Sequence, residues 1–110
     1  MQIGKNLFEM TGCSPLSCRI EFRVHATKRM FERKINQSDI LLVIDKGSII
    51  EEYPDDYPFP SVLINGIDSL GKHIHCLVSF DRITKRFYII TVYYPDQQKW
   101  QDGFSKRKLL

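Results

Sequence analysis

Two consecutive stretches in the second half of the chain decide the fold. Residues 73–81 are His-Ile-His-Cys-Leu-Val-Ser-Phe-Asp, and residues 86–94 are Arg-Phe-Tyr-Ile-Ile-Thr-Val-Tyr-Tyr. In the first stretch the even positions are apolar, while the odd positions include two histidines and a serine. This is the two-residue period of a half-buried strand. Both stretches are rich in β-branched and aromatic residues, and the short connection between them predicts an antiparallel hairpin.

The two-residue period extends backward along the chain. It predicts four strands in all: residues 48–53, 61–67, 73–81 and 86–94. The segment 54–60 contains three prolines, which predicts a stiff loop. The later connections are short and require antiparallel neighbours. Residues 18–24 alternate over a shorter stretch, and we expect either a fifth strand or an extended approach to a helix.

A helix is predicted for residues 25–34, which contain no Gly or Pro. At about 100° per residue, its charged side chains lie on one arc. These are His25, Lys28, Arg29, Glu32 and Arg33. Ala26, Met30 and Phe31 lie elsewhere on the helix, and we expect them to face the core.

A second helix is predicted between Asn36 and Gly47. Asn36 followed three residues later by Asp39 resembles a capping box, and Gly47 stands where helices commonly end. Residues 40–44 are all apolar, so this helix should be largely buried. The elements together predict an α+β fold, with two N-terminal helices packed on a curved antiparallel sheet of four or five strands.

The length of 110 residues suffices for one domain. We expect that domain to span residues 21–107, after an irregular N-terminal lead-in of residues 1–20. No apolar run approaches the roughly 20 residues that cross a bilayer. Residues 1–9 lack the apolar centre of a secretory signal. These features predict a soluble cytoplasmic protein.

The chain contains three cysteines, Cys13, Cys18 and Cys76. An odd number without a secretory signal argues against a disulfide framework. The spacing of Cys13 and Cys18 is wider than that of a C-x-x-C metal site, which disfavours metal binding there. Cys76 alternates with apolar residues of the third strand, so we expect it in the core.

The charge is unevenly distributed, although the net charge is only +3. Residues 23–34 and 99–108 are basic, and residues 51–56 between them are acidic. Two basic segments that meet in space suit an anionic partner such as nucleic acid. A solvated surface with balanced charge accounts for the composition equally well.

The polar residues include the groups that a metal-independent ribonuclease requires. Such an enzyme needs a general base, a general acid and cations that stabilise charge on phosphorus. Histidine titrates near neutral pH, and arginine binds phosphate through its planar fork. The candidates are His25, His75 and Tyr93 as catalytic residues, and Arg29, Arg33, Thr91 and Trp100 as substrate-binding residues. For each of these residues a purely structural role is the alternative: capping a helix, packing in the core or lying on a solvated surface.

Two other functions remain open from the residues alone. His73 and His75 lie two apart on one strand face and can chelate zinc, although Asp81 is the nearest carboxylate on that face. Alternatively, the open face of the sheet can bind a protein or RNA without catalysis.

A set of motifs between about Val24 and Arg107 resembles the domain-of-unknown-function family numbered four-two-five-eight. The residues that carry the resemblance are His25-Ala26, Arg29-Met30, Arg33, Ile35, Asp39-Ile40, Gly47, the segment from Tyr53 to Ser61, His75, the segment from Ile90 to Tyr93, Pro95-Asp96 and Trp100. Such domains are similar to small bacterial toxins of the RelE, BrnT and MqsR kinds, with a RelE/barnase-like fold.

The resemblance implies a toxin that cleaves RNA, with ribosome-bound RNA as one expected target. It also implies a small zinc-finger antitoxin as partner. No cofactor and no membrane are expected. The matched polar positions are His25, Arg29, Arg33, His75, Thr91 and Tyr93. They agree with the candidates chosen from the chemistry.

Overall fold

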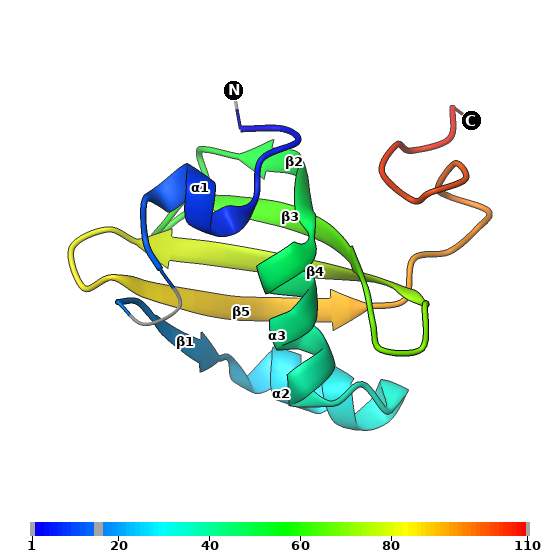
Figure 1. Cartoon of the computed structure of the whole chain (residues 1–110), viewed down its shortest axis with the longest axis horizontal. Coiled ribbons are helices and arrows are strands. Elements are labelled where there is room, and N and C mark those ends of the chain that lie inside the picture. The colour runs from blue at the N-terminus through cyan, green and yellow to red at the C-terminus, as the bar shows by residue number, and fades with distance from the viewer. Residues whose placement is uncertain (1, 15–16, 110) are drawn as a thin grey trace.

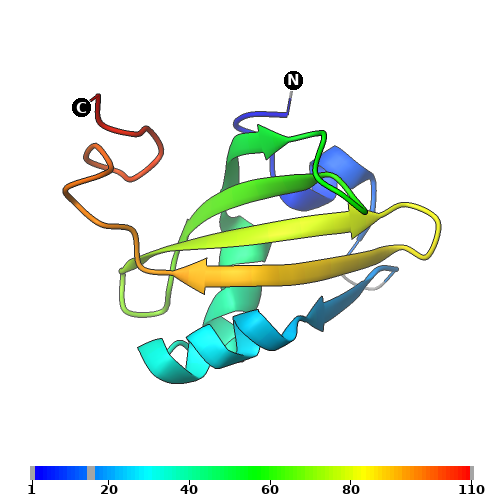
Figure 2. The same ribbon diagram turned by 180° about the vertical axis from the view of Figure 1, so that it is seen from behind.

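The computed structural model describes residues 2–14 and 17–109. In chain order the elements are α1 (Leu7–Thr11), β1 (Arg19–Phe22), α2 (Val24–Arg33), α3 (Gln37–Lys46), β2 (Ser48–Tyr53), β3 (Ser61–Ile67), β4 (His73–Asp81) and β5 (Arg86–Tyr93). Helices α1 and α3 cover one face of the sheet (Figure 1). The opposite face, here called the outer face, carries no helix (Figure 2). Within the described ranges, every helix is too short or too polar to span a bilayer.

The sheet has five strands in the order β1-β5-β4-β3-β2. Strands β2 to β5 form the predicted antiparallel meander. Strand β1 pairs with β5 in parallel, with Arg19 opposite Arg86 and Phe22 opposite Ile89. The predicted all-antiparallel sheet is therefore wrong at one edge, and the sheet is mixed. Loop-length rules miss this pair because its two strands are far apart in the sequence.

Helix α2 lies along the edge of β5, beyond the point where β1 ends (Figure 2). The backbone amide of Arg23 donates to the Ile89 carbonyl at 3.0 Å. At the other end of the helix, the Arg33 guanidinium donates to the Val92 carbonyl at 2.6 Å. The edge of β5 is thus covered by β1 over its first part and by α2 over the rest, which protects its polar groups from other strands.

The faces of α2 follow the sequence pattern with one exception. The charged side chains of the predicted arc are all exposed. Ala26 is fully buried, and Met30 packs against the core. Phe31 was expected to face the core, but its side chain is 88% exposed. Because α2 packs against an edge instead of a sheet face, its buried stripe is narrow.

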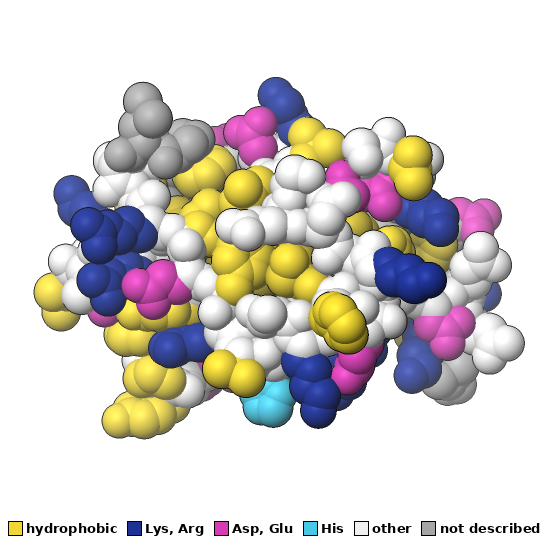
Figure 3. Space-filling model, turned by 90° about the horizontal axis from the view of Figure 1, so that it is seen from below, with side chains coloured by type: hydrophobic (Ala, Val, Ile, Leu, Met, Phe, Trp, Pro, Cys, Tyr) yellow, Lys and Arg dark blue, Asp and Glu magenta, His cyan; other side chains and the backbone are white. Residues whose placement is uncertain are grey.

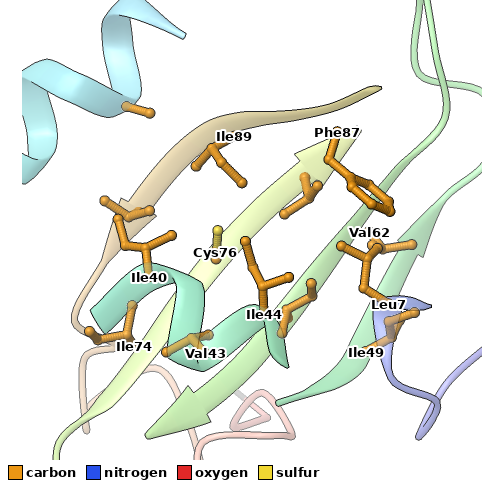
Figure 4. Close-up of a cluster of buried hydrophobic side chains, with 14 of the residues drawn as sticks. Leu7, Ile40, Val43, Ile44, Ile49, Val62, Ile74, Cys76, Phe87 and Ile89 are labelled. Carbon is orange, nitrogen blue, oxygen red and sulfur yellow. The ribbon is translucent and has the colours of Figure 1, made fainter. Parts of the chain in front are cut away.

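Helix α3 packs on the middle of the sheet and supplies Ile40, Val43 and Ile44 to the core (Figure 4). The Asn36 side chain accepts a hydrogen bond from the Asp39 amide at 2.8 Å, which confirms the predicted N-cap. The Asp39 carboxylate accepts from the Ser69 amide at 3.1 Å. It therefore ties the helix to the β3–β4 turn, in place of closing a capping box.

The N-terminal lead-in contains a short helix, α1, which the sequence pattern did not predict. Asn6 caps it, because its side chain accepts from the Phe8 amide at 2.9 Å. Leu7 is buried, and Phe8 packs edge-on against Phe87 with ring centroids 5.8 Å apart. Residues 15 and 16 of the expected irregular lead-in lie outside the described residues.

Cys13 and Cys18 are joined by a disulfide, contrary to expectation. An odd number of cysteines still allows two that are close in sequence to form one disulfide. This disulfide connects the end of α1 to the start of β1. It leaves neither sulfur as a thiolate ligand, which removes the metal alternative for that pair. Cys76 is free and fully buried, as predicted, and burial raises the pKa of its thiol.

A bulge in β5 decides which side chains share the outer face. Leu77 of β4 lies opposite Thr91, whereas the next residue, Val78, lies opposite Ile89. The extra residue on β5 interrupts the alternation. As a result Ile89 belongs to the core, whereas Thr91 and Tyr93 lie on the face of His75, which is opposite Tyr93.

Gly66 of β3 allows α3 to approach the sheet closely. A Cβ at this position would lie 2.8 Å from Cγ1 and 3.0 Å from Cα of Val43. We expect Gly66→Ala to lower the free energy of unfolding by about 1–3 kcal/mol, measured by urea denaturation. In a Val43→Ala background this loss should shrink, because the side-chain part of the clash is gone. Equal losses in both backgrounds would contradict the close approach.

Candidate functional site

The C-terminal segment, residues 95–109, continues from the end of β5 and lies at that end of the sheet (Figures 1 and 2). Trp100 and Arg107 form an antiparallel bridge that closes the intervening residues into a loop. The Asn65 side chain of β3 donates to the Gly103 carbonyl at 2.9 Å and to the Ser105 hydroxyl at 3.1 Å. The loop is therefore attached to the sheet by specific hydrogen bonds.

His75 of β4 lies at the centre of this attachment and is fully buried. Its Nε2 donates to the Phe104 carbonyl at 2.7 Å, so Nδ1 is left to accept from the Tyr93 hydroxyl at 3.1 Å. The Trp100 indole packs edge-on against the imidazole with centroids 4.5 Å apart. Burial lowers the pKa of His75 to about 4, so the ring is neutral at pH 7.

A pocket of about 400 Å³ opens beside this cluster. We call it the cationic pocket, and it is lined by Arg33, Tyr93, Tyr94, Asp96, Lys99, Trp100 and Arg107. Its three cations come from the end of α2 and from the C-terminal segment, which are far apart in the sequence. Only Asp96 opposes them among the lining residues. Glu51, which lies outside the lining, pairs with Arg107, so the positive charges exceed the negative ones by one, and this excess favours an anionic ligand.

Arg107 forms one wall of the cationic pocket and is held from two sides. Its guanidinium lies 4.5 Å from the centroid of the Trp100 ring. It also donates to both oxygens of Glu51 on β2, at 2.7 and 3.0 Å. Arg107 lowers the pKa of the Glu51 carboxyl, and the Tyr53 hydroxyl donates to the same carboxylate. This arrangement presents the guanidinium to the pocket in a defined orientation.

The structure brings four of the predicted site residues together. Arg33, Tyr93 and Trp100 line the cationic pocket, and His75 lies directly behind the latter two. Trp100 is only 3% exposed and covers His75, so its ring is not free to stack on a base. Thr91 shares the outer face with Tyr93 but does not line the pocket.

His25 and Arg29 do not join this group. His25 is exposed at the start of α2, eight residues before Arg33, which puts it roughly 12 Å away along the helix axis. Arg29 forms a salt bridge with Glu32 at 2.9 Å. The face seen in Figure 3 carries a histidine with Lys or Arg side chains on one side of it and a hydrophobic side chain on the other. The expected pair of His25 and His75 is not formed, since one ring is on the surface and the other lies beneath Trp100.

His73 and His75 share the outer face, as predicted, but their nitrogens are not arranged as a chelate. Both nitrogens of His75 are engaged, and Nδ1 of His73 lies 3.1 Å from the Asn65 side-chain oxygen. The Asp81 carboxylate accepts from the Ile83 amide and the Thr84 hydroxyl. Over residues 2–14 and 17–109, no three His, Cys, Asp or Glu side chains are grouped to hold a metal.

Several residues of the site were not among the candidates chosen from the sequence. These are Glu51, Tyr94, Asp96, Lys99 and Arg107. The basic character of residues 99–108 was a usable signal, because it marked a segment that could bind an anion. The position of this segment depends on the bonds from Asn65 and His75, which no local pattern reveals.

The fold and the pocket define a small α+β domain with a site suited to an anion. The profile of the family described as "Domain of unknown function (DUF4258)" matches residues 22–94. The chain belongs to this family. Neither the curated proteins nor the solved structures gave a match. The matched range is shorter than the predicted one and ends at Tyr94, so Lys99, Trp100 and Arg107 lie beyond it.

The buried, neutral His75 makes the stability of the fold depend on pH. Its pKa is about 4 in the folded chain, and about 6.5 is normal for the unfolded chain. Between pH 4 and pH 6.5, the unfolded state binds a proton on His75 that the folded state does not bind. The contribution of His75 to the free energy of unfolding is therefore fully present above pH 6.5 and is lost as the pH falls toward 4. We expect a loss of about 3 kcal/mol between pH 7 and pH 4 from this residue. Urea denaturation over this range measures it.

His75→Gln is the informative variant, because it removes this titration. It should be less stable at pH 7, but its stability should change less as the pH falls. His25→Gln replaces an exposed histidine and should keep the pH dependence of the unmodified chain. An unchanged pH dependence in His75→Gln would contradict the assignment.

Proposed function

We propose that the chain is a toxin-like endoribonuclease that binds the RNA backbone in the cationic pocket. The observation that carries this proposal is the convergence of Arg33, Lys99 and Arg107 on the pocket wall that holds Tyr93. A phosphodiester is an anion, and its charge grows as the transition state forms. Fixed cations around the reacting phosphate stabilise that charge. An RNA substrate would place the activity in the cytoplasm.

We favour RNA over an inorganic anion as the ligand of this pocket because of its chemistry. Its 2′-hydroxyl supplies an internal nucleophile, so cleavage needs only proton transfer and charge stabilisation from the protein. The combination of helices with one curved sheet is also what the resemblance to toxins of the RelE, BrnT and MqsR kinds implies. This likeness supports the proposal as an analogy.

Tyr93 and His75 offer a route for the proton. The 2′-oxygen attacks phosphorus, a 2′,3′-cyclic phosphate forms and the bond to the 5′-oxygen breaks. The proton of the 2′-hydroxyl passes to the Tyr93 oxygen, while Tyr93 passes its own proton to Nδ1 of His75, 3.1 Å away. The 5′-oxygen takes a proton from water, and the hydroxide formed removes the proton of Nδ1 of His75 through the Tyr93 hydroxyl, so the imidazole is neutral again when the reaction ends. Burial raises the pKa of Tyr93, which keeps its hydroxyl protonated between turnovers. This relay replaces the pair of His25 and His75 expected from the sequence.

Lys99→Ala gives the sharpest test of the cationic pocket. The Lys99 side chain forms no salt bridge or hydrogen bond with the described residues, so its removal changes charge with little effect on the fold. We expect the rate of cleavage of a fluorescent single-stranded RNA to fall by a factor on the order of 10–100. Tyr93→Phe should lower it further, because the relay loses its hydroxyl.

Lys28→Ala is the matched control, since Lys28 is exposed on α2 and does not line the pocket. It should cleave at nearly the unmodified rate. Equal rates for Lys28→Ala and Lys99→Ala would show that the pocket is not where RNA binds.

A non-catalytic RNA-binding module is the second candidate, and one observation favours it. Both ring nitrogens of His75 are hydrogen-bonded within the protein, so a substrate cannot contact them directly. A substrate proton reaches His75 only through the Tyr93 hydroxyl. RNA binding that depends on Lys99, without formation of cyclic phosphate ends, would establish this alternative and exclude the relay.

For the partner, we infer an acidic protein that covers α2, in line with the zinc-finger antitoxin implied by the resemblance. Val24 and Phe31 are 83% and 88% exposed, and their spacing of seven residues puts them on one side of the helix, with Lys28 between them. Phe31→Asp should prevent rescue of growth by a co-expressed zinc-finger antitoxin, while RNA cleavage stays unchanged. Full rescue of this variant would place the partner elsewhere.

A further inference from the structure

A second pocket, of about 490 Å³, opens on the other side of Tyr94. Its lining includes Lys72, His73, Tyr94, Pro95, Gln97 and Phe104. Tyr94 also lines the cationic pocket, so the two pockets share one side chain as a wall. Both are lined by residues from the end of β5 and from the C-terminal segment.

Three aromatic side chains line this second pocket, those of His73, Tyr94 and Phe104. The rings of His73 and Phe104 lie 4.9 Å apart and are tilted by 48°. Tyr94 is 38% exposed, and the Lys72 ammonium lies 5.5 Å from the centroid of its ring. Aromatic rings with nearby hydrogen-bond donors are how proteins hold the splayed bases of single-stranded RNA.

Polar groups at the rim can read the edge of such a base. The Lys72 ammonium and the Gln97 amide both line the pocket. Nδ1 of His73 is engaged by Asn65, whereas Nε2 has no hydrogen-bond partner among the described residues. A flat, partly apolar ligand with hydrogen-bonding edges therefore fits the lining better than a second phosphate, because Lys72 is its only lysine or arginine.

We propose that this pocket is a nucleobase subsite for the nucleotide next to the phosphate in the cationic pocket. The subsite rests on the proposed function, because the bound phosphate determines where the strand lies. Tyr94 then stacks on the base, and Lys72, Gln97 and His73 contact its edge. The subsite makes these four residues the determinants of which base is accepted beside the cleaved bond.

Fluorescence anisotropy with a 2′-O-methyl RNA, which resists cleavage, tests the subsite. Tyr94→Ala should weaken binding about tenfold, whereas Tyr94→Phe should bind like the unmodified chain, because stacking needs only the ring. Tyr57→Ala is the matched control, since Tyr57 is 94% exposed in the β2–β3 loop, and it should bind normally. A set of oligonucleotides with one abasic position each locates the base concerned. When that base is missing, the stacking on Tyr94 is already lost, so Tyr94→Ala should not weaken RNA binding further.

The outcomes separate the subsite from the cationic pocket. If Lys99→Ala weakens binding and Tyr94→Ala does not, the subsite is wrong and the phosphate site stands. If neither variant weakens binding, both are wrong. If Tyr94→Ala weakens binding equally for intact RNA and for every abasic RNA, Tyr94 acts on the fold or on the phosphate, and the nucleobase subsite is overturned.

Discussion

The hydrogen bond from Nε2 of His75 to the Phe104 carbonyl is the contact on which the site depends. It requires a proton on Nε2, and burial beneath Trp100 lowers the pKa of the ring, which keeps the resting imidazole neutral at pH 7. The same bond attaches the C-terminal segment to β4, and that segment carries two of the three cations of the pocket. Protonation state, segment position and pocket charge are therefore linked through one side chain.

The edge of β5 is the second constraint, because an uncovered strand edge exposes unpaired polar groups. Strand β1 and helix α2 together cover this edge. At the end of α2, the Arg33 guanidinium donates a hydrogen bond to the Val92 carbonyl. The bond also brings Arg33 to the cationic pocket, beside the next residue of β5, Tyr93. The Arg33 side chain thus forms a hydrogen bond with a backbone carbonyl of the strand edge and also supplies positive charge to the site.

Much of the fold follows from local patterns. The bounds predicted for β2, β3 and β4 agree with the structure, and Asn36 caps α3 as expected. The alternation in β4 correctly sends Cys76 into the core and His75 to the opposite face. It does not indicate that His75 is buried, because the cover comes from Trp100 and Phe104, which are more than twenty residues further along the chain.

The sequence by itself determined the four strands of the meander, the two longer helices, most of the core positions and the cationic arc of α2, since each depends on neighbours a few residues away. Only the tertiary structure decided the parallel β1–β5 pair, the bulge that turns Tyr93 toward His75, and the meeting of Arg33 with Lys99 and Arg107. These features join segments distant in sequence. Their register is set by packing and hydrogen bonding across the sheet, which no periodicity along the chain encodes.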